Sequence, residues 1–365
     1  MKVRRMLGFS RKEVLEIVRD PITVWIALFM PLVMLFLFGY ALSFDVKDTP
    51  LVIVDHDKTP ASRALADQFL NTDYFHLAGA LEDERAAEHA LMRGEARAVL
   101  SIPSQFGRKL AQGENASVEF LVDGSYGTTA AIVSAYGRAI MYAFPQGTLE
   151  LPVQPQVRVW YNPQLRSRDF IVPGLFAVIL MAFPPLLTAL AVAREKEVGT
   201  IAQIYASPLT KTEFIVGKLL PYVGIASVQL GIVLAGGFLW IKIPMHGSFL
   251  LLLALGLLYV LCTVSIGLLI STVVRTQVAA MLVTIIVTLM PSFLFSGFIY
   301  PIFTMPEFFQ GYSARIPTMY FVNISRGIVM RGADLSDLWF NVVVLIAYTA
   351  VVLGAATFLF KKRVG

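Results

Sequence analysis

Charged residues are scarce in this chain of 365 residues, of which Asp, Glu, Lys and Arg make up only 15%. A typical soluble domain contains about 25%. Apolar residues make up 56%, which is more apolar surface than a soluble globular protein can bury. Cysteine is almost absent, because Cys262 is the single one, and this excludes a disulfide scaffold. The composition therefore excludes a soluble or disordered protein and predicts a membrane protein with several spans and room for one extramembrane domain.

Long uncharged runs contain most of the apolar residues. A membrane-spanning helix needs about 20 mostly apolar residues, and six runs reach that length without Asp, Glu, Lys or Arg. They are residues 22–42, 170–193, 219–241, 249–274, 278–300 and 339–360. We expect helices, because lone strands would leave backbone groups unpaired in lipid. Residues 126–144 are a borderline seventh run that contains Arg138, and we expect a helix outside the membrane there.

Basic residues gather in four short segments, which are residues 1–20, residues 194–218, Arg275 and residues 361–363. With six spans, all four segments lie on the same side of the membrane, and an excess of Lys and Arg marks the cytoplasmic side. We therefore expect both termini in the cytoplasm. The net charge of +5 follows from this topology and requires no nucleic acid partner. No charged residue lies within a span, which disfavours ion-coupled transport.

The segment between the first two spans, residues 45–169, has a soluble composition in which strand-like and helical stretches alternate. The expected strands are residues 51–54, 74–77, 96–102, 118–122 and 156–161, and the expected helices are residues 59–71, 82–93, 103–111 and 126–144. Such alternation predicts an α/β domain, which the topology places outside the cytoplasm. Asp55, His56 and Asp57 follow the first strand. We interpret them as a turn that leads to a helix cap at Thr59, with a metal or acid–base cluster as the alternative.

The predicted fold class is an α-helical polytopic membrane protein with six transmembrane helices and an inserted extracytoplasmic α/β domain. Residues 1–44 comprise a cytoplasmic interfacial helix and the first transmembrane helix, and residues 45–169 comprise the inserted domain. Residues 170–365 contain the other five transmembrane helices. Within this last part, residues 194–218 form a cytoplasmic loop and residues 301–338 an extracytoplasmic re-entrant segment.

The residues before the first span are predicted to form a short helix in the headgroup plane of the membrane. Ser10 and Glu13 have the spacing of a capping box, and Asp20-Pro21 ends the helix. The basic and apolar residues of this helix are Arg11, Lys12, Val14, Leu15, Ile17, Val18 and Arg19. The alternative is an ordinary basic flank.

Residues 194–218 join the second and third spans and have the pattern of a compact helix–turn–helix. Ile201, Ile204 and Tyr205 share one face of a short helix that Ser207-Pro208 interrupts, and Thr210-x-x-Glu213 is a second capping box. A passive linker would need neither the caps nor the apolar stripe. The alternative is a tight connection without a further role.

Several prolines between the fifth and sixth spans separate short apolar pieces, which predicts short helices that dip toward the membrane. Their apolar residues form a candidate external gate, namely Phe308, Phe309, Met319, Tyr320 and Phe321. We expect Arg315, Arg326 and Arg331 at the water boundary. The alternative is a surface loop packed on the extramembrane domain. Pro184-Pro185 and Pro291 lie inside spans and mark candidate hinges.

The run Arg-Glu-Lys-Glu-Val-Gly-Thr at residues 194–200, followed by Ser-Pro-Leu-Thr at 207–210 and Gly-Lys at 217–218, resembles the coupling region of the ABC-2 type permease family. Residues 160–163 and 172–174 resemble further positions of that family. The order of the spans, with a large domain after the first, resembles its drug-exporter branch.

This resemblance implies the membrane subunit of a bacterial ABC exporter, a type-2 permease of the inner membrane that moves an apolar or amphipathic drug, lipid or metabolite outward. It implies an ATPase-coupling site at Glu195, Glu197, Gly199, Thr200, Ile201, Ile204, Tyr205 and Pro208. The sequence has no phosphate-binding loop, so we expect no catalysis by this chain itself, no metal and no cofactor in it. ATP with Mg²⁺ is expected in a partner ATPase that docks on the interfacial helix and the loop.

Further implied partners are membrane lipid and a second permease copy or a sibling permease, while a periplasmic adaptor is left open. A rival hypothesis from another class is a non-transporting membrane sensor or assembly factor whose extracytoplasmic domain binds a protein.

Overall fold

The computed structural model divides the chain into two units. Residues 1–43 and 159–365 form the helical unit, and residues 44–158 form the sheet unit. The residues that the structure describes are 3–41, 48–114, 116–125, 127–144, 166–200 and 210–360.

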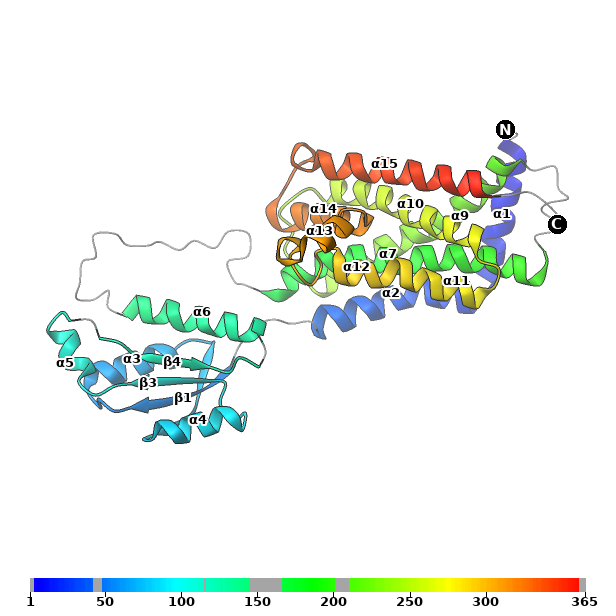
Figure 1. Ribbon diagram of the computed structural model, residues 1–365. Helices are drawn as coiled ribbons and strands as arrows, with labels where there is room; N and C mark the ends of the chain where they lie inside the picture. Colours follow the sequence, from blue (N-terminus) through cyan, green and yellow to red (C-terminus); the bar gives the residue numbers. More distant parts are fainter. Residues whose placement is uncertain are drawn as a thin grey trace. The chain divides into compact units, whose positions relative to one another are not determined.

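Six helices of the helical unit are long and apolar enough to cross a membrane, as predicted (Figure 1). They are α2 (Pro21–Ala41), α7 (Ser167–Val198), α9 (Lys211–Ala235) with the π-helical turn η2 (Gly236–Trp240), α10 (Phe249–Val273), α11 (Gln277–Thr284) with η3 (Ile285–Leu289) and α12 (Met290–Phe295), and α15 (Leu335–Leu359). The fifth span is therefore interrupted by a π-helical turn just before Pro291. Together with the sheet of the other unit, these helices confirm the predicted fold class.

Helix α7 is the central element of the bundle. It packs against α2, α9, α10 and α11, and most of its residues are buried. The break suggested by Pro184-Pro185 is absent, because α7 is continuous over 32 residues. A Cβ atom at Gly267 of α10 would lie only 2.4 Å from the carbonyl oxygen of Pro185. The glycine thus lets α10 pack directly on the backbone of α7 at the prolines.

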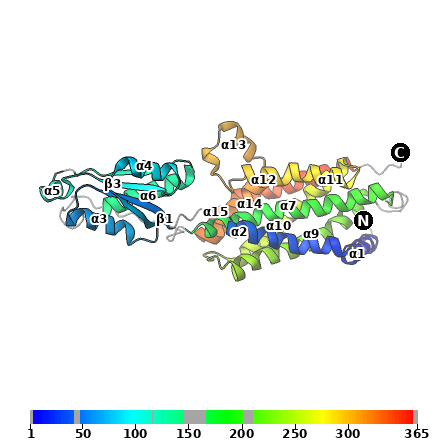
Figure 2. The ribbon, with the colours of Figure 1, turned by 90° about the horizontal axis from the view of Figure 1, so that it is seen from below.

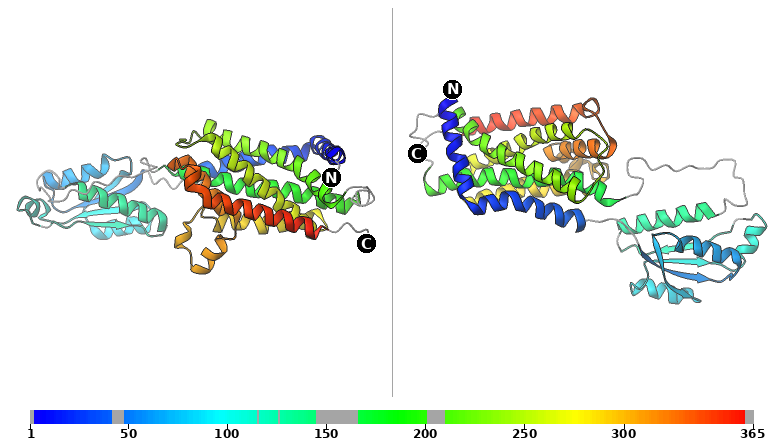
Figure 3. Two further views of the ribbon diagram at one scale, coloured as in Figure 1. Left: turned by 90° about the horizontal axis from the view of Figure 1, so that it is seen from above. Right: turned by 180° about the vertical axis from the view of Figure 1, so that it is seen from behind.

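Helix α1 (Val3–Arg19) lies across the ends of the other helices and packs on α9 (Figures 1 and 3). It ends before Asp20-Pro21, as predicted. The expected capping box at Ser10 is wrong, because the helix already includes Val3 and Ser10 lies inside it. The side that packs on the bundle includes Ser10, Glu13 and Ile17, whereas most of the predicted apolar face (Val14, Leu15 and Val18) is exposed. We call this end of the bundle the α1 end.

The opposite end of the bundle carries three shorter helices between α12 and α15. They are η4 (Ile302–Thr304), α13 (Glu307–Ser313) and α14 (Pro317–Arg331). Helix α14 packs against α7, α10 and α15, and its residues are mostly buried. Helix α13 protrudes from the bundle beside α12 (Figure 2).

The sheet unit is built on four strands in the order β2-β1-β3-β4. These are β1 (Thr49–Asp55), β2 (Phe75–Leu81), β3 (Ala98–Ile102) and β4 (Glu119–Val122). Strand β1 pairs in parallel with β2 and β3, and β4 is antiparallel to β3. One face packs against α3 (Pro60–Leu70), α5 (Phe106–Ala111) and α6 (Gly127–Ala143), and the other against α4 (Glu84–Met92) (Figure 1).

Helix α6 contributes Val133 to the core of the sheet unit, so the borderline seventh run is a helix of this unit. The strand expected at residues 156–161 lies outside the described residues.

Asp55, His56 and Asp57 form the turn that the sequence indicates. Oδ1 of Asp55 accepts hydrogen bonds from the backbone N–H groups of Asp57 and Lys58, each at 2.9 Å. Oδ2 of Asp57 accepts from the hydroxyl of Thr59 at 2.5 Å and from the N–H of Gly107 at 2.8 Å. Both carboxylates therefore stabilise the loop that precedes α3, whose cap is Thr59.

Candidate functional site

Four consecutive charged residues end α7 at the α1 end of the bundle, and each contacts a different part of the unit. We call Arg194, Glu195, Lys196 and Glu197 the α7 tetrad. Nη1 of Arg194 donates to Oδ2 of Asp20 at 2.8 Å, at the corner between α1 and α2. Glu195 contacts two lysines, with Oε2 lying 2.9 Å from Nζ of Lys218 on α9 and Oε1 lying 3.3 Å from Nζ of Lys12 on α1.

The other two members of the tetrad bind the connection between α10 and α11. Nζ of Lys196 donates to the carbonyl oxygens of Thr272 at 3.2 Å and Val274 at 2.9 Å, and also to that of Ser271. These carbonyls belong to the last turn of α10, where a cation is favoured by the helix dipole. Oε2 of Glu197 accepts from the backbone N–H of Gln277 at 2.9 Å, at the start of α11. The tetrad thus connects the end of α7 to α1, to α9, to the corner before α2 and to the connection between α10 and α11.

A charged cluster of Lys12, Glu13, Glu16, Glu195 and Lys218 fills the junction of α1, α7 and α9. Lys218 is only 1% exposed, and its Nζ lies 2.8 Å from Oε2 of Glu13, which is also buried. Lys12 reaches Oε1 of Glu16 at 3.0 Å. A buried ammonium group needs such partners, because an unpaired charge in a low-dielectric interior is very unfavourable. Lys218 therefore binds α9 to both α1 and α7.

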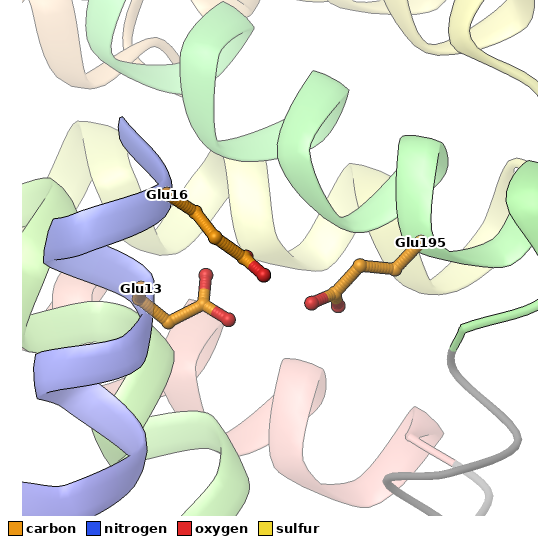
Figure 4. Close-up of side chains that lie close together, drawn as sticks. All are labelled: Glu13, Glu16 and Glu195. Atoms are coloured by element: carbon orange, nitrogen blue, oxygen red, sulfur yellow. The ribbon is translucent and has the colours of Figure 1, made fainter. Parts of the chain in front are cut away.

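The carboxylates of Glu13, Glu16 and Glu195 point toward one another (Figure 4), and one oxygen of each lies within 4.8 Å of the others. Such a group of oxygens could hold a divalent cation. The ammonium groups of Lys12 and Lys218 already provide positive charge between these carboxylates, at distances of 2.8 to 3.4 Å. Burial lowers the pKa of Lys12, but the hydrogen bond with Glu16 and the negative charges around it outweigh this and raise the pKa to about 12. We therefore interpret the cluster as an ion-pair network.

Gly217 allows α1 to approach α9 closely. A Cβ atom at this position would lie 2.7 Å from Cδ1 of Phe9, and the hydroxyl of Ser10 donates to the Gly217 carbonyl oxygen at 2.9 Å. The pair Gly217-Lys218, which the sequence singles out, thus has two physical roles. The glycine provides the contact surface for α1, and the lysine provides the buried charge.

The structure describes half of the predicted coupling residues. Glu195 and Glu197 have the contacts given above. Gly199 caps the end of α7 with φ of 81°, which is a conformation that favours glycine, and Thr200 donates from its hydroxyl to the carbonyl oxygen of Glu195 at 3.4 Å. The remaining predicted residues lie outside the described residues, namely Ile201, Ile204, Tyr205 and Pro208. Glu13 and Lys218 were not predicted as site residues. Lys218 could have been noticed as a single charge among the apolar residues of α9, whereas Glu13 lies in a charged stretch and gives no such signal.

The predicted gate residues do not form one group in this structure. Phe308 and Phe309 lie on α13, where Phe308 is 78% exposed and Phe309 stacks on Phe295 with ring centroids 5.1 Å apart. Tyr320 and Phe321 are buried in the bundle on α14. Met319 on α14 is partly buried. The predicted set thus divides into a surface pair on α13 and a packed group on α14.

Arg326 on α14 is partly buried, and its guanidinium group is bonded to backbone carbonyls. Nη1 donates to the carbonyl oxygen of Gly297 at 2.7 Å, Nη2 to that of Phe298 at 2.8 Å and Nε to that of Phe170 at 3.1 Å. The guanidinium group also lies 3.6 Å from the centre of the Phe170 ring, a cation–π contact. A Cβ atom at Gly174 would lie 2.8 Å from Nη2. Arg326 therefore joins α14 to the start of α7 and to the loop after α12.

Comparison with known proteins identifies the family. The profile of the ABC-2 family transporter proteins matches residues 21–358. The chain is 32% identical to a probable multidrug ABC transporter permease, YbhR of Escherichia coli, over 99% of both chains. It is 30% identical to the probable multidrug ABC transporter permease YbhS of the same organism, over 99% of this chain and 97% of the relative. With six helices that can span a membrane, the chain is a multi-pass inner-membrane protein, and it belongs to the ABC-2 transporter family.

Proposed function

We propose that the chain is the permease subunit of an ATP-driven exporter that moves an apolar or amphipathic substrate out of the cytoplasm or the inner leaflet. A separate cytoplasmic ATPase supplies the energy, and a second copy or a sibling permease completes the pathway. The names of YbhR and YbhS, each given as a probable multidrug ABC transporter permease, support this function.

The α7 tetrad is the observation that carries the proposal. Residues 199–210 connect α7 to α9 in the chain, so a displacement of this connection by an ATPase acts on the end of α7 as well as on the start of α9. From there, Arg194 transmits the displacement to the α1–α2 corner and Glu195 to α1 and α9. Lys196 and Glu197 transmit it to the connection of α10 and α11. A connection without a mechanical role would not need a separate contact for each of four consecutive residues.

The proposed orientation places the α1 end in the cytoplasm and the sheet unit outside it. Cysteine-labelling of intact cells with a membrane-impermeant thiol reagent tests this. We expect Glu114→Cys to be labelled and Thr212→Cys to remain unlabelled, whereas both should react after the cells are permeabilised. Glu114 is the better position than its neighbour Gly113, whose φ of 70° disfavours other residues. The native Cys262 is buried, so it adds little background. Labelling of Thr212→Cys in intact cells would show that the α1 end lies outside the cytoplasm and would contradict the proposed orientation.

ATP-dependent transport can be measured in inverted membrane vesicles that contain the permease together with its ATPase. We expect ATP to drive a lipophilic fluorescent cation into these vesicles, since their interior corresponds to the outside of the cell. Vesicles with a hydrolysis-deficient ATPase are the matched control. If no ATPase copurifies with the chain and ATP drives neither this probe nor a fluorescent lipid, the exporter proposal is wrong.

A further inference from the structure

An open groove lies at the α1 end between the start of α9 and the last turns of α15. It is lined by Lys211, Ala350, Leu353, Gly354, Thr357 and Phe358, and its volume is about 590 Å³. Most of this lining is apolar. Even the hydroxyl of Thr357 donates to the Leu353 carbonyl oxygen of its own helix at 2.8 Å, so it needs no partner in the groove.

Two features show that the groove opens outward and not into the bundle. A Cβ atom at Gly354 would have no atom within 4 Å beyond the nearby backbone of its own helix, so the missing side chain leaves open space in the groove. Phe214 of α9 stacks on Phe360, with ring centroids 4.6 Å apart, and both belong to a buried cluster with Ala356. This cluster closes the inner side. An occupant of the groove must therefore come from the surroundings of the bundle, which for a membrane-spanning helix is lipid.

Lys211 gives the groove one charged edge. It is the first residue of α9, its side chain is exposed, and it forms no ion pair with any residue in the described part of the chain. The helices α9 and α15 are both candidate spans, and Lys211 lies where one begins and the other approaches its end. This level corresponds to the boundary between acyl chains and headgroups, where lysine extends its ammonium group toward the polar layer.

We propose that the groove binds an anionic phospholipid, with an acyl chain against Ala350, Leu353 and Gly354 and the phosphate at Lys211. The apolar floor fits the acyl chain, and the exposed ammonium group, which has no ion-pair partner among the described residues, selects a net negative headgroup over a zwitterionic one. This proposal does not depend on the transport function, because it requires only that α9 and α15 span the membrane. It assigns a binding role to Lys211 and Gly354, neither of which contacts the charged cluster.

Native mass spectrometry of the full-length protein tests this proposal. The protein is purified from nanodiscs of phosphatidylcholine mixed with phosphatidylglycerol, and the retained lipids are identified. We expect the wild type to retain phosphatidylglycerol preferentially. Lys211→Gln should lower the retention several-fold by removing the charge, and Gly354→Leu should lower it by filling the groove.

Two matched variants control for charge and volume elsewhere. Arg275→Gln removes an exposed positive charge at the same end of the bundle, and Gly224→Leu fills an exposed glycine position on α9 where a Cβ has no close neighbour. Both should retain phosphatidylglycerol as the wild type does. Unchanged retention in Lys211→Gln and Gly354→Leu would overturn the proposal. A change of oligomeric state in Gly354→Leu with unchanged lipid retention would also overturn the proposal, since the groove would then be a contact surface between two copies of the chain.

Discussion

Replacing Lys218 with methionine should destabilise the helical unit by about 3–5 kcal/mol, the range found when one partner of a buried ion pair is removed. Methionine preserves much of the apolar stem but removes the ammonium group that lies 2.8 Å from Glu13 and 2.9 Å from Glu195. Both carboxylates are buried, so they would lose their cation without gaining water. The free energy of unfolding in detergent micelles measures the loss.

Two further variants separate the ion pair from the loss of a positive charge as such. Arg275→Met alters an exposed basic residue at the same end of the bundle and should change the free energy of unfolding by no more than about 0.5 kcal/mol. The triple variant Lys218→Met, Glu13→Gln and Glu195→Gln removes the uncompensated charges and should recover most of the loss. If Lys218→Met is as stable as Arg275→Met, α1, α7 and α9 are not held together by the charged cluster.

Replacing Arg326 with methionine should cost at least about 3 kcal/mol. Three carbonyl oxygens lose a charged donor, and a hydrogen bond to a charged group contributes a net stabilisation of about 1.5–3 kcal/mol. The affected carbonyls belong to Phe170, Gly297 and Phe298. Lysine at this position should recover only part of the loss, since it lacks the planar fork that reaches all three oxygens. Thermal unfolding of the purified protein, followed at several denaturant concentrations, provides the measurement.

The matched control for this effect is Arg315→Met. Arg315 is exposed and donates to a single carbonyl, that of Gly311, at 2.7 Å. Its replacement should change stability by no more than about 0.5 kcal/mol. Equal stability of the Arg315→Met and Arg326→Met proteins would mean that α14 is held in place by apolar packing alone.

The spans and the sheet unit could be predicted because their determinants are local. An uncharged run of sufficient length can satisfy its backbone in lipid only as a helix, and the alternation in the sheet unit repeats within short windows. The turn at Asp55 to Asp57 and the cap at Thr59 were also predictable, since nearly all of their partners lie within a few residues.

The charged cluster could not be predicted, because its partners are distant in sequence. Ser10 and Glu13 have the same spacing as Thr210 and Glu213, yet only the second pair forms a capping box. Ser10 and Glu13 instead face Gly217 and Lys218 of another helix. A spacing rule identifies residues that can bond locally, but the stronger tertiary partner, a buried ammonium group, decides which bond forms.

The same reasoning applies to Arg326 and to the prolines of α7. The local sequence does not reveal that Arg326 is bonded to the carbonyl oxygens of Gly297 and Phe298, where the chain turns after α12. At Pro184-Pro185 the helix α7 is continuous, and α10 packs directly on its backbone through Gly267. In both places the tertiary environment supplies partners that the local sequence does not reveal.

The most direct test of the central claim is ATP hydrolysis by the reconstituted complex of this permease with its ATPase. We predict that Ile204→Asp abolishes the stimulation of hydrolysis by substrate, because it would place a charge in the apolar contact that we propose between this residue and the ATPase. Expression and membrane insertion should stay normal, and the conservative control Ile204→Val should keep the stimulation. Unchanged stimulation and transport in Ile204→Asp, with the ATPase still bound, would show that this segment does not couple ATP hydrolysis to the bundle.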